Sequence, residues 1–96
     1  MNYSVYILQL SDGSYYTGYT KDLNNRLHQH AEKRGSKYVR SRLPFNLVHE
    51  EKFEDRSKAM RRELEIKKYT RIKKQDLISK DIDTSWNHYQ SQYDFA

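Results

Sequence analysis

The order of hydrophobic and polar residues at the start of the chain predicts a β-hairpin. Residues 3–10 are an uncharged run of aromatic, β-branched and aliphatic side chains, which is typical of a strand buried on both faces. The Asp12-Gly13 pair that follows is a strong turn signal, and residues 14–17 supply the returning strand. Gly18 marks either the end of this strand or a position where another group approaches the backbone closely.

The next part of the chain predicts a helix and a third strand. In residues 22–34, aliphatic side chains recur at four-residue spacing, with Asp22 as a suitable N-cap and Gly35 as a natural C′ residue. Residues 36–44 are basic, end in a proline and predict an irregular connection. Residues 46–53 then predict the third strand.

Two further helices are predicted in the second half of the chain. Either Asp55 or Ser57 caps a helix that runs to about residue 69, and residues 72–79 form a shorter helix. Residues 81–96 are polar with scattered aromatic side chains, and their pattern predicts no definite element.

The predicted order of hairpin, helix, strand, helix and helix indicates an α+β fold, with a small three-stranded antiparallel-type sheet flanked by helices. The chain has 96 residues, enough for one domain and too few for two. We therefore expect one domain over residues 1–79 and a C-terminal extension over residues 80–96.

Several kinds of site and compartment are excluded by composition. The chain has no cysteine, which excludes a disulfide framework, a thiolate zinc site and a cysteine nucleophile. Its first residues show no basic region followed by an apolar run, and no apolar stretch approaches the roughly 18 residues of a membrane span. We expect a soluble, cytoplasmic protein with no membrane partner.

The charge of the chain favours a polyanionic partner. Lysine and arginine number 18 against 13 acidic residues, which gives a formal net charge of +5. When such a surface binds phosphates it releases condensed counterions, so nucleic acid is one expectation. A basic surface that only keeps the protein soluble is the alternative.

The helix that follows Ser57 places polar residues on its apolar face. At about 100° per residue, one arc of this helix contains the apolar side chains and predicts the face toward the core: Ala59, Met60, Leu64 and Ile66. Glu63 and Lys67 fall inside that arc. A carboxylate there is costly unless it is paired or binds a metal, so Glu63 is either a metal ligand or an i,i+4 partner of Lys67.

The first helix has a similar polar edge. Arg26 and His30 are i,i+4 neighbours beside the apolar stripe, so their side chains project together. Arg26 is either a functional cation or a surface partner of Asp22, and His30 is either functional or a boundary histidine with a satisfied ring. In the hairpin, either Tyr15 or Tyr16 shares a face with Tyr6, and these rings either serve a site or only pack.

Together these residues resemble one known pattern, that of the GIY-YIG nucleases. Ser4-Val5-Tyr6 stands where the family has Gly-Ile-Tyr, and Tyr16-Thr17-Gly18 stands where it has Tyr-Ile-Gly. Arg26 and His30 match the arginine and the His/Tyr of the following helix, and Glu63 matches the glutamate of a later helix.

The likeness is greatest to the small stand-alone bacterial members. It includes Gly35-Ser36-Lys37-Tyr38 and the helix with the Ala-x-x-x-Glu pattern at residues 59–63, and it extends over residues 3–79. Gly18 matches the family's glycine and would have a structural role.

The sequence departs from the family pattern at three points. Ser4 replaces a glycine and Thr17 replaces an isoleucine. Some members also use an asparagine near the end of the domain, for which Asn87 is only a candidate.

The resemblance implies a divalent-metal-dependent endonuclease that hydrolyses phosphodiester bonds in DNA. Glu63 would hold one Mg²⁺ or Mn²⁺ ion, and Arg26 would stabilise charge on the phosphoryl oxygens. Either Tyr6 or Tyr16 would accept the proton from water, and His30 would orient a tyrosine or relay the proton.

A basic run between the first helix and the third strand is a candidate contact for the DNA backbone. Its residues, together with Lys67, are the predicted nucleic-acid-binding side chains: Lys33, Arg34, Lys37, Tyr38, Arg40 and Arg42. A solvated loop is the alternative interpretation. The sequence contains no element that resembles a base reader, so low sequence specificity is expected.

Two other functions fit the same sequence. One is a non-catalytic module of the same fold that binds nucleic acid, with DNA the expected partner and RNA the alternative. The other is a recruitment module whose protein partner contacts the aromatic residues of segment 86–95. The sequence predicts no oligomeric state.

Overall fold

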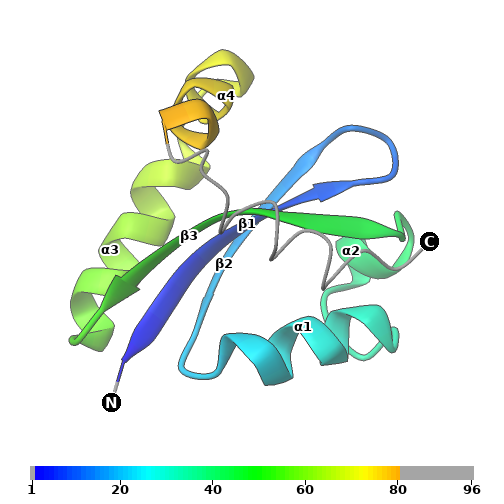
Figure 1. Cartoon of the computed structure of the whole chain (residues 1–96), viewed down its shortest axis with the longest axis horizontal. Helices are drawn as coiled ribbons and strands as arrows, with labels where there is room; N and C mark the ends of the chain where they lie inside the picture. Colours follow the sequence, from blue (N-terminus) through cyan, green and yellow to red (C-terminus); the bar gives the residue numbers. More distant parts are fainter. Residues whose placement is uncertain (1, 81–96) are drawn as a thin grey trace.

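The computed structural model describes residues 2–80 and confirms the predicted α+β class (Figure 1). Three strands and four helices follow one another in this part of the chain. They are β1 (Tyr3–Leu10), β2 (Tyr15–Thr20), α1 (Leu23–Ala31), α2 (Lys37–Arg40), β3 (Phe45–Phe53), α3 (Arg56–Lys67) and α4 (Arg71–Lys80).

The three strands form one antiparallel sheet in the order β2-β1-β3. β1 is central, which explains why its sequence is apolar on both faces, as predicted. The hairpin turn has Gly13 at φ +85°, and the Asp12 carboxylate accepts the backbone N–H of Ser14 at 3.0 Å. An irregularity in the pairing of β1 with β3 falls between Ile7 and Leu8.

Helices cover both faces of the sheet, and each face has its own core (Figure 1). Side chains alternate along β1, so Tyr6 and Leu8 pack with α1 and α2, while Val5 and Ile7 pack on the opposite face with α3. The helix α4 adds Leu77 to this second core. The sheet therefore carries the tyrosine of the first family motif on the face covered by α1.

The C-terminal end of α1 differs from the prediction. The helix ends at Ala31 rather than near residue 34, and Lys33 adopts the left-handed φ of 65° that was expected of Gly35. Gly35 is needed for space instead, because a Cβ there would lie 2.3 Å from Nδ1 of His30. The assignment of Gly35 as a C′ residue was therefore wrong, although its glycine has a clear physical reason.

The basic connection after α1 is more ordered than predicted. Lys37–Arg40 forms the short helix α2, whose first turn is capped by Ser36 through a 3.2 Å hydrogen bond from the backbone N–H of Tyr38. β2 is also longer than predicted and passes through Gly18, which pairs with Tyr6. Of the two interpretations of Gly18, close approach is confirmed, since a Cβ there would lie 2.6 Å from the Tyr6 hydroxyl.

The helix α3 is rotated relative to the predicted wheel. Asp55 is its N-cap and accepts the N–H of Ser57 at 2.7 Å. Ala59 and Ile66 are buried as expected, but the prediction for two other side chains was wrong: Met60 and Leu64 are 39% and 54% exposed. The buried stripe is centred on Ala59 and bordered by partly buried Arg62 and Glu63, because β3 offers Arg62 a charged partner.

Two further findings concern the helices of the described residues. α4 agrees with the helix expected over residues 72–79. No helix within residues 2–80 has the length and hydropathy needed to cross a membrane. Asn87 and the aromatic segment 86–95 lie outside the described residues.

Candidate active site

The candidate site is built around the hydroxyl group of Tyr6 in the central strand. Tyr6 is 1% exposed, and its oxygen lies 3.0 Å from Nε2 of His30, which is fully buried on α1. The missing side chain at Gly18 makes this possible, since the Tyr6 ring passes over that position of β2. The structure therefore joins residues of both family motifs and of α1 at one oxygen atom.

Aromatic rings extend this centre toward the surface. The ring of Tyr16 contacts those of Tyr6 and His30, with centroid distances of 6.4 Å and 5.5 Å. On the side of α2, Tyr16 stacks with Tyr38 at 6.5 Å, and Tyr38 is 41% exposed. Tyr16 thus connects a buried tyrosine with an exposed one, and Tyr16 rather than Tyr15 shares the face of Tyr6.

Arg26 is positioned by a residue that the sequence interpretation missed. Its Nη1 donates to Oε1 of Gln29 at 3.0 Å, while Asp22, the expected surface partner, accepts the N–H of Asn25 as the N-cap of α1. The i,i+3 spacing of Arg26 and Gln29 is the only signal in the sequence for this contact. Arg26 is partly buried, and its guanidinium lowers the pKa of the Tyr6 hydroxyl.

The environment of Tyr6 keeps its hydroxyl protonated. Burial raises the pKa of Tyr6 well above its ordinary value, and the neighbouring Tyr16 and Glu63 raise it further. A hydrogen-bonding effect and the positive charge of Arg26 oppose this rise without cancelling it. Tyr6 is therefore a neutral phenol at pH 7 in the isolated protein, within reach of one cation and one carboxylate.

His30 is neutral at the same pH. Burial, followed by the charge of Arg26, lowers the pKa of His30 from 6.5 to about 4. Its Nδ1 is buried against Gly35 and has no hydrogen-bond partner within the part of the chain that the structure describes. The Tyr6 hydroxyl and the neutral imidazole therefore share one hydrogen bond, and the His30 tautomer decides which of the two groups donates it.

Glu63, on α3, is close enough to Tyr6 to raise the pKa of that hydroxyl, and its side chain is 14% exposed. The Lys67 Nζ lies 3.6 Å from Glu63 Oε2, so the predicted i,i+4 contact is present, although Lys67 is half-exposed rather than on the buried stripe. Within residues 2–80, no group of three or more histidine, cysteine, aspartate and glutamate side chains is arranged to hold a metal ion. Any divalent ion bound here would have Glu63 as its carboxylate and water for most of its other ligands.

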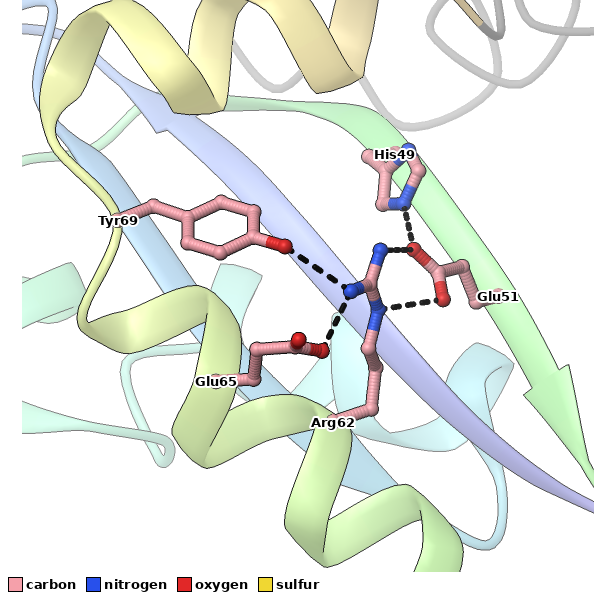
Figure 2. A network of polar contacts seen from close by, with 5 residues as sticks. All are labelled: His49, Glu51, Arg62, Glu65 and Tyr69. Carbon is pink, nitrogen blue, oxygen red and sulfur yellow. Dashed lines mark hydrogen bonds and ion pairs between the residues drawn. The ribbon is translucent and has the colours of Figure 1, made fainter.

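A polar network holds the helix that carries Glu63 (Figure 2). Arg62 makes two hydrogen bonds to Glu51 of β3, Nε to Oε1 at 2.9 Å and Nη2 to Oε2 at 3.0 Å. Its Nη1 also donates to Glu65 at 2.6 Å and to the Tyr69 hydroxyl at 3.1 Å, and His49 lies 2.6 Å from Glu51. The sequence interpretation missed this network because its central pair, Glu51 and Arg62, is eleven residues apart and joins a strand to a helix.

The electrostatic balance of the network favours the charged carboxylate. Burial alone would raise the pKa of Glu51, but hydrogen bonds from His49 and Arg62 and the charge of Arg62 lower it to about 2. A bidentate arginine–carboxylate pair restricts both partners in direction as well as distance. Since Arg62 directly precedes Glu63, this pair fixes the orientation of α3 at the position of Glu63.

The predicted nucleic-acid-binding residues lie mostly on and around α2, with Lys67 apart from them on α3. Lys33, Lys37 and Arg40 are exposed, and Arg34 is exposed but ion-paired with Glu32. Arg42 is the most constrained of the set, because its guanidinium lies 3.8 Å from the centroid of the Tyr38 ring and 3.0 Å from Asp12.

The fold and this arrangement of tyrosine, histidine, arginine and glutamate define a GIY-YIG protein. The chain belongs to this family: its residues 2–76 match the family model described as the GIY-YIG catalytic domain. Family membership indicates a function of the nuclease type acting on nucleic acid. The resemblance stated from the two tyrosine motifs is confirmed.

Individual relatives place the chain among small single-domain members. It is 53% identical over 74 residues to a UPF0213 protein of Staphylococcus aureus, covering 77% of this chain and 90% of that protein. The solution structure of the UPF0213 protein of Bacillus halodurans is 45% identical, with a TM-score of 0.61 over 92% of this chain and 94% of that one. The solution structure of a protein of E. faecalis is 38% identical, with a TM-score of 0.60 over 83% of this chain and 85% of that one.

Proposed function

We propose that the protein is a divalent-metal-dependent endonuclease that hydrolyses phosphodiester bonds in DNA with low sequence specificity. The meeting of Tyr6, His30 and Arg26 at one hydroxyl group, beside the carboxylate of Glu63, is the single observation that supports this function most. Hydrolysis of a phosphodiester requires a proton acceptor, a cation for the phosphoryl oxygens and assistance to the leaving oxygen. The site contains a residue type for each requirement.

Glu63 is the residue that would hold the metal ion. Mg²⁺ and Mn²⁺ prefer oxygen ligands, and Mg²⁺ in particular is commonly held by one or two carboxylates while keeping several waters. One partly exposed carboxylate fits such a water-rich site. When bound, the ion would act as a Lewis acid on the phosphoryl and leaving oxygens.

The two tyrosines have different roles in this proposal. Tyr6 is enclosed and its pKa is raised, chiefly by burial, so it orients the site and is a poor acceptor. Tyr16 is half-buried and lies between Tyr6 and the exposed Tyr38, so water reaches it more easily. We assign proton acceptance to Tyr16 and the positioning of its ring to Tyr6 and His30.

Arg26 would bind the phosphoryl oxygens. Its guanidinium has a planar set of donors, of which Nη1 is engaged with Gln29. The remaining donors match two oxygens of a phosphate group better than a lysine ammonium would. The exposed cations around α2 would contact backbone phosphates farther from the cleaved bond.

The decisive experiment is cleavage of labelled single-stranded, duplex and branched DNA in Mg²⁺, Mn²⁺ or EDTA. We expect metal-dependent cleavage by the wild-type protein and none by Glu63→Gln or Arg26→Ala. Glu65→Gln is the matched control, because it makes the same charge change on the same helix at a 57% exposed side chain.

Three results would change these assignments. Full activity of a folded Glu63→Gln variant would contradict the metal site. Tyr6→Phe that loses as much activity as Tyr16→Phe, with no shift in the pH–rate profile of either, would contradict the division between the tyrosines. Salt-sensitive DNA binding without cleavage of any substrate would support a non-catalytic binding module of the same fold.

A further inference from the structure

A cavity lies outside the cluster around Tyr6. It has a volume of about 380 Å³ and is lined by Tyr3, Tyr19, Lys21 and Arg56. It lies where β1 begins, β2 ends and α3 starts, near the end of the chain marked N in Figure 1. Cavities of a few hundred Å³ are in the size range of small-molecule sites.

The lining combines aromatic rings with positive charge. Tyr3 and Tyr19 are half-buried against the core beneath α3, so their rings are held by packing, whereas Lys21 and Arg56 are exposed. Arg56 Nη2 lies 3.5 Å from the Tyr19 hydroxyl, which keeps a cation beside this ring. Aromatic rings stack on nucleobases, and lysine and arginine bind phosphates.

The carboxylates next to these cations in sequence are directed elsewhere. Asp22 follows Lys21 but accepts the backbone N–H of Asn25 as the N-cap of α1. Asp55 precedes Arg56 but accepts the N–H of Ser57 as the N-cap of α3. Among residues 2–80, the side chains that line the cavity are therefore cationic and aromatic, with no carboxylate among them.

The cavity is connected to the proposed catalytic centre through α3. Tyr19 directly follows Gly18, so its side chain lies on the face of the sheet that α3 covers, opposite the face of the Tyr6 ring. Arg56 and Glu63 are seven residues apart on α3, which places them on one face and about 10 Å apart along its axis. A nucleic-acid strand whose cleaved phosphate lay at Glu63 would thus have a neighbouring nucleotide at the cavity.

We infer that this cavity binds one unpaired nucleotide of the substrate strand, its base against Tyr19 and its phosphate at Lys21 and Arg56. The inference rests on the proposed nuclease function for its role, but the binding itself requires neither metal nor cleavage. A base in a duplex is stacked and paired, so only an unpaired or extruded base can use an aromatic cavity. The cavity thereby favours substrates with an unpaired nucleotide beside the cleaved bond.

The test is a titration of the full chain with thymidine 3′,5′-bisphosphate in EDTA, followed by NMR chemical shifts. We expect saturable shifts at the amides of Tyr19, Lys21 and Arg56. Lys21→Ala and Arg56→Ala should each raise the Kd about fivefold through a lost phosphate contact. Lys58→Ala is the matched control, an exposed cation two residues farther along α3, and should change the Kd less than about twofold.

Substitutions of Tyr19 test the contribution of base stacking to binding separately from that of charge. Tyr19→Leu should raise the Kd about tenfold, since base stacking on an aromatic ring is lost, whereas Tyr19→Phe should retain affinity within about twofold. Inorganic phosphate with the same Kd and shifts as the nucleotide would overturn the inference and leave only an anion site. Unchanged binding by Tyr19→Leu would overturn it as well.

The outcomes for this cavity and for the nuclease function are distinct. Nucleotide binding at Tyr19 by a protein that cleaves no DNA would support the cavity and contradict the nuclease proposal. Metal-dependent cleavage by a protein whose Tyr19, Lys21 and Arg56 signals do not respond to the nucleotide would support the nuclease and overturn the cavity.

Discussion

A substitution of Gly18 is expected to disturb the geometry of the site more than the stability of the fold. A Cβ at this position would lie 2.6 Å from the Tyr6 hydroxyl and 2.7 Å from the ring carbon that bears it. Gly18→Ala must therefore displace the Tyr6 ring, and with it the hydrogen bond to His30. We predict a fall in cleavage rate of about 100-fold, because displacements near 1 Å have that effect on positioned groups.

The same substitution should leave the protein folded. Overpacking of this kind costs about 1–3 kcal/mol, which thermal unfolding followed by circular dichroism measures. Wild-type cleavage by folded Gly18→Ala would show that the position of the Tyr6 hydroxyl does not matter for the reaction. A variant that fails to fold would show that the sheet cannot accommodate the displaced ring at all.

Thr17 departs from the family pattern, and we expect this departure to lower the free energy of unfolding. It is 3% exposed, and its buried hydroxyl oxygen has no hydrogen-bond partner among the described residues 2–80. Thr17→Val keeps the shape and removes the unsatisfied group, so we predict a rise in the free energy of unfolding of about 1 kcal/mol. Thr20→Val is the matched control in β2, and it should destabilise because Thr20 accepts the Asp22 N–H at 3.2 Å.

Urea denaturation of both threonine variants provides the measurement. The predicted effects have opposite signs although both substitutions exchange a hydroxyl for a methyl group in the same strand. If Thr17→Val were destabilising, the hydroxyl would have a partner in solution, such as an ordered water.

At the scale of elements, the pair of Glu51 and Arg62 fixes α3 against β3. The Arg62 guanidinium and the Glu51 carboxylate are each 23% exposed and form two hydrogen bonds, so removing one charge leaves the other partly desolvated. We predict that Glu51→Gln lowers the free energy of unfolding by about 2 kcal/mol at pH 7. Glu65→Gln, which affects the same arginine from an exposed side chain, should cost about 0.5 kcal/mol or less.

The pH dependence of stability distinguishes Glu51 from the other buried groups. Its pKa falls from 4.5 to about 2 in the folded protein, so its contribution is complete above pH 4.5 and is lost as the pH falls from 4.5 toward 2. The pKa of His30 falls from 6.5 to about 4, so stability is lost between those values as the unfolded chain takes up a proton.

Glu51→Gln should therefore flatten only the lower part of the acid-unfolding profile. The loss of stability between pH 6.5 and pH 4 remains, because His30 is unchanged in that variant. A wild-type slope between pH 4.5 and pH 2 in Glu51→Gln would assign the acid sensitivity of that range to a different carboxylate.

The elements themselves show which interactions a sequence reveals. β1, the hairpin turn and α4 were predicted correctly, because their patterns depend on neighbours in the chain. The prediction of the buried face of α3 was wrong at Met60 and Leu64. The helix is rotated so that Arg62 reaches Glu51 of β3, which lies eleven residues earlier in the chain. Periodicity records apolar positions but not a charged partner that the fold supplies.

The candidate site shows the same division. Tyr6, Arg26, His30 and Glu63 were identified from spacing and from the family resemblance, and the structure brings them around one hydroxyl group. Gln29 was not identified, because a glutamine at i+3 has no distinctive pattern. The sequence likewise could not predict that the cavity beside Tyr19 forms, since its lining comes from β1, β2, α3 and the loop that contains Lys21.

At the scale of the whole molecule, the cations behind the net charge of +5 are not equally available to bind DNA. Lys37 and Arg40 are exposed on α2, whereas Arg42 is already engaged with Asp12 and the Tyr38 ring. Only a cation that neutralises a phosphate releases counterions, so the salt dependence of binding reports which of these residues touch DNA.

We predict that the slope of log Kd against log salt for a duplex falls by about 0.9 for each phosphate contact removed. The Lys37→Ala, Arg40→Ala double variant should lose about twice that amount, and Arg42→Ala clearly less than one contact because Asp12 already offsets its charge. Fluorescence anisotropy in EDTA at several salt concentrations measures the slopes without cleavage. Equal slopes for the wild-type protein and the double variant would remove α2 from the DNA-binding surface and transfer that role to the cations of α3.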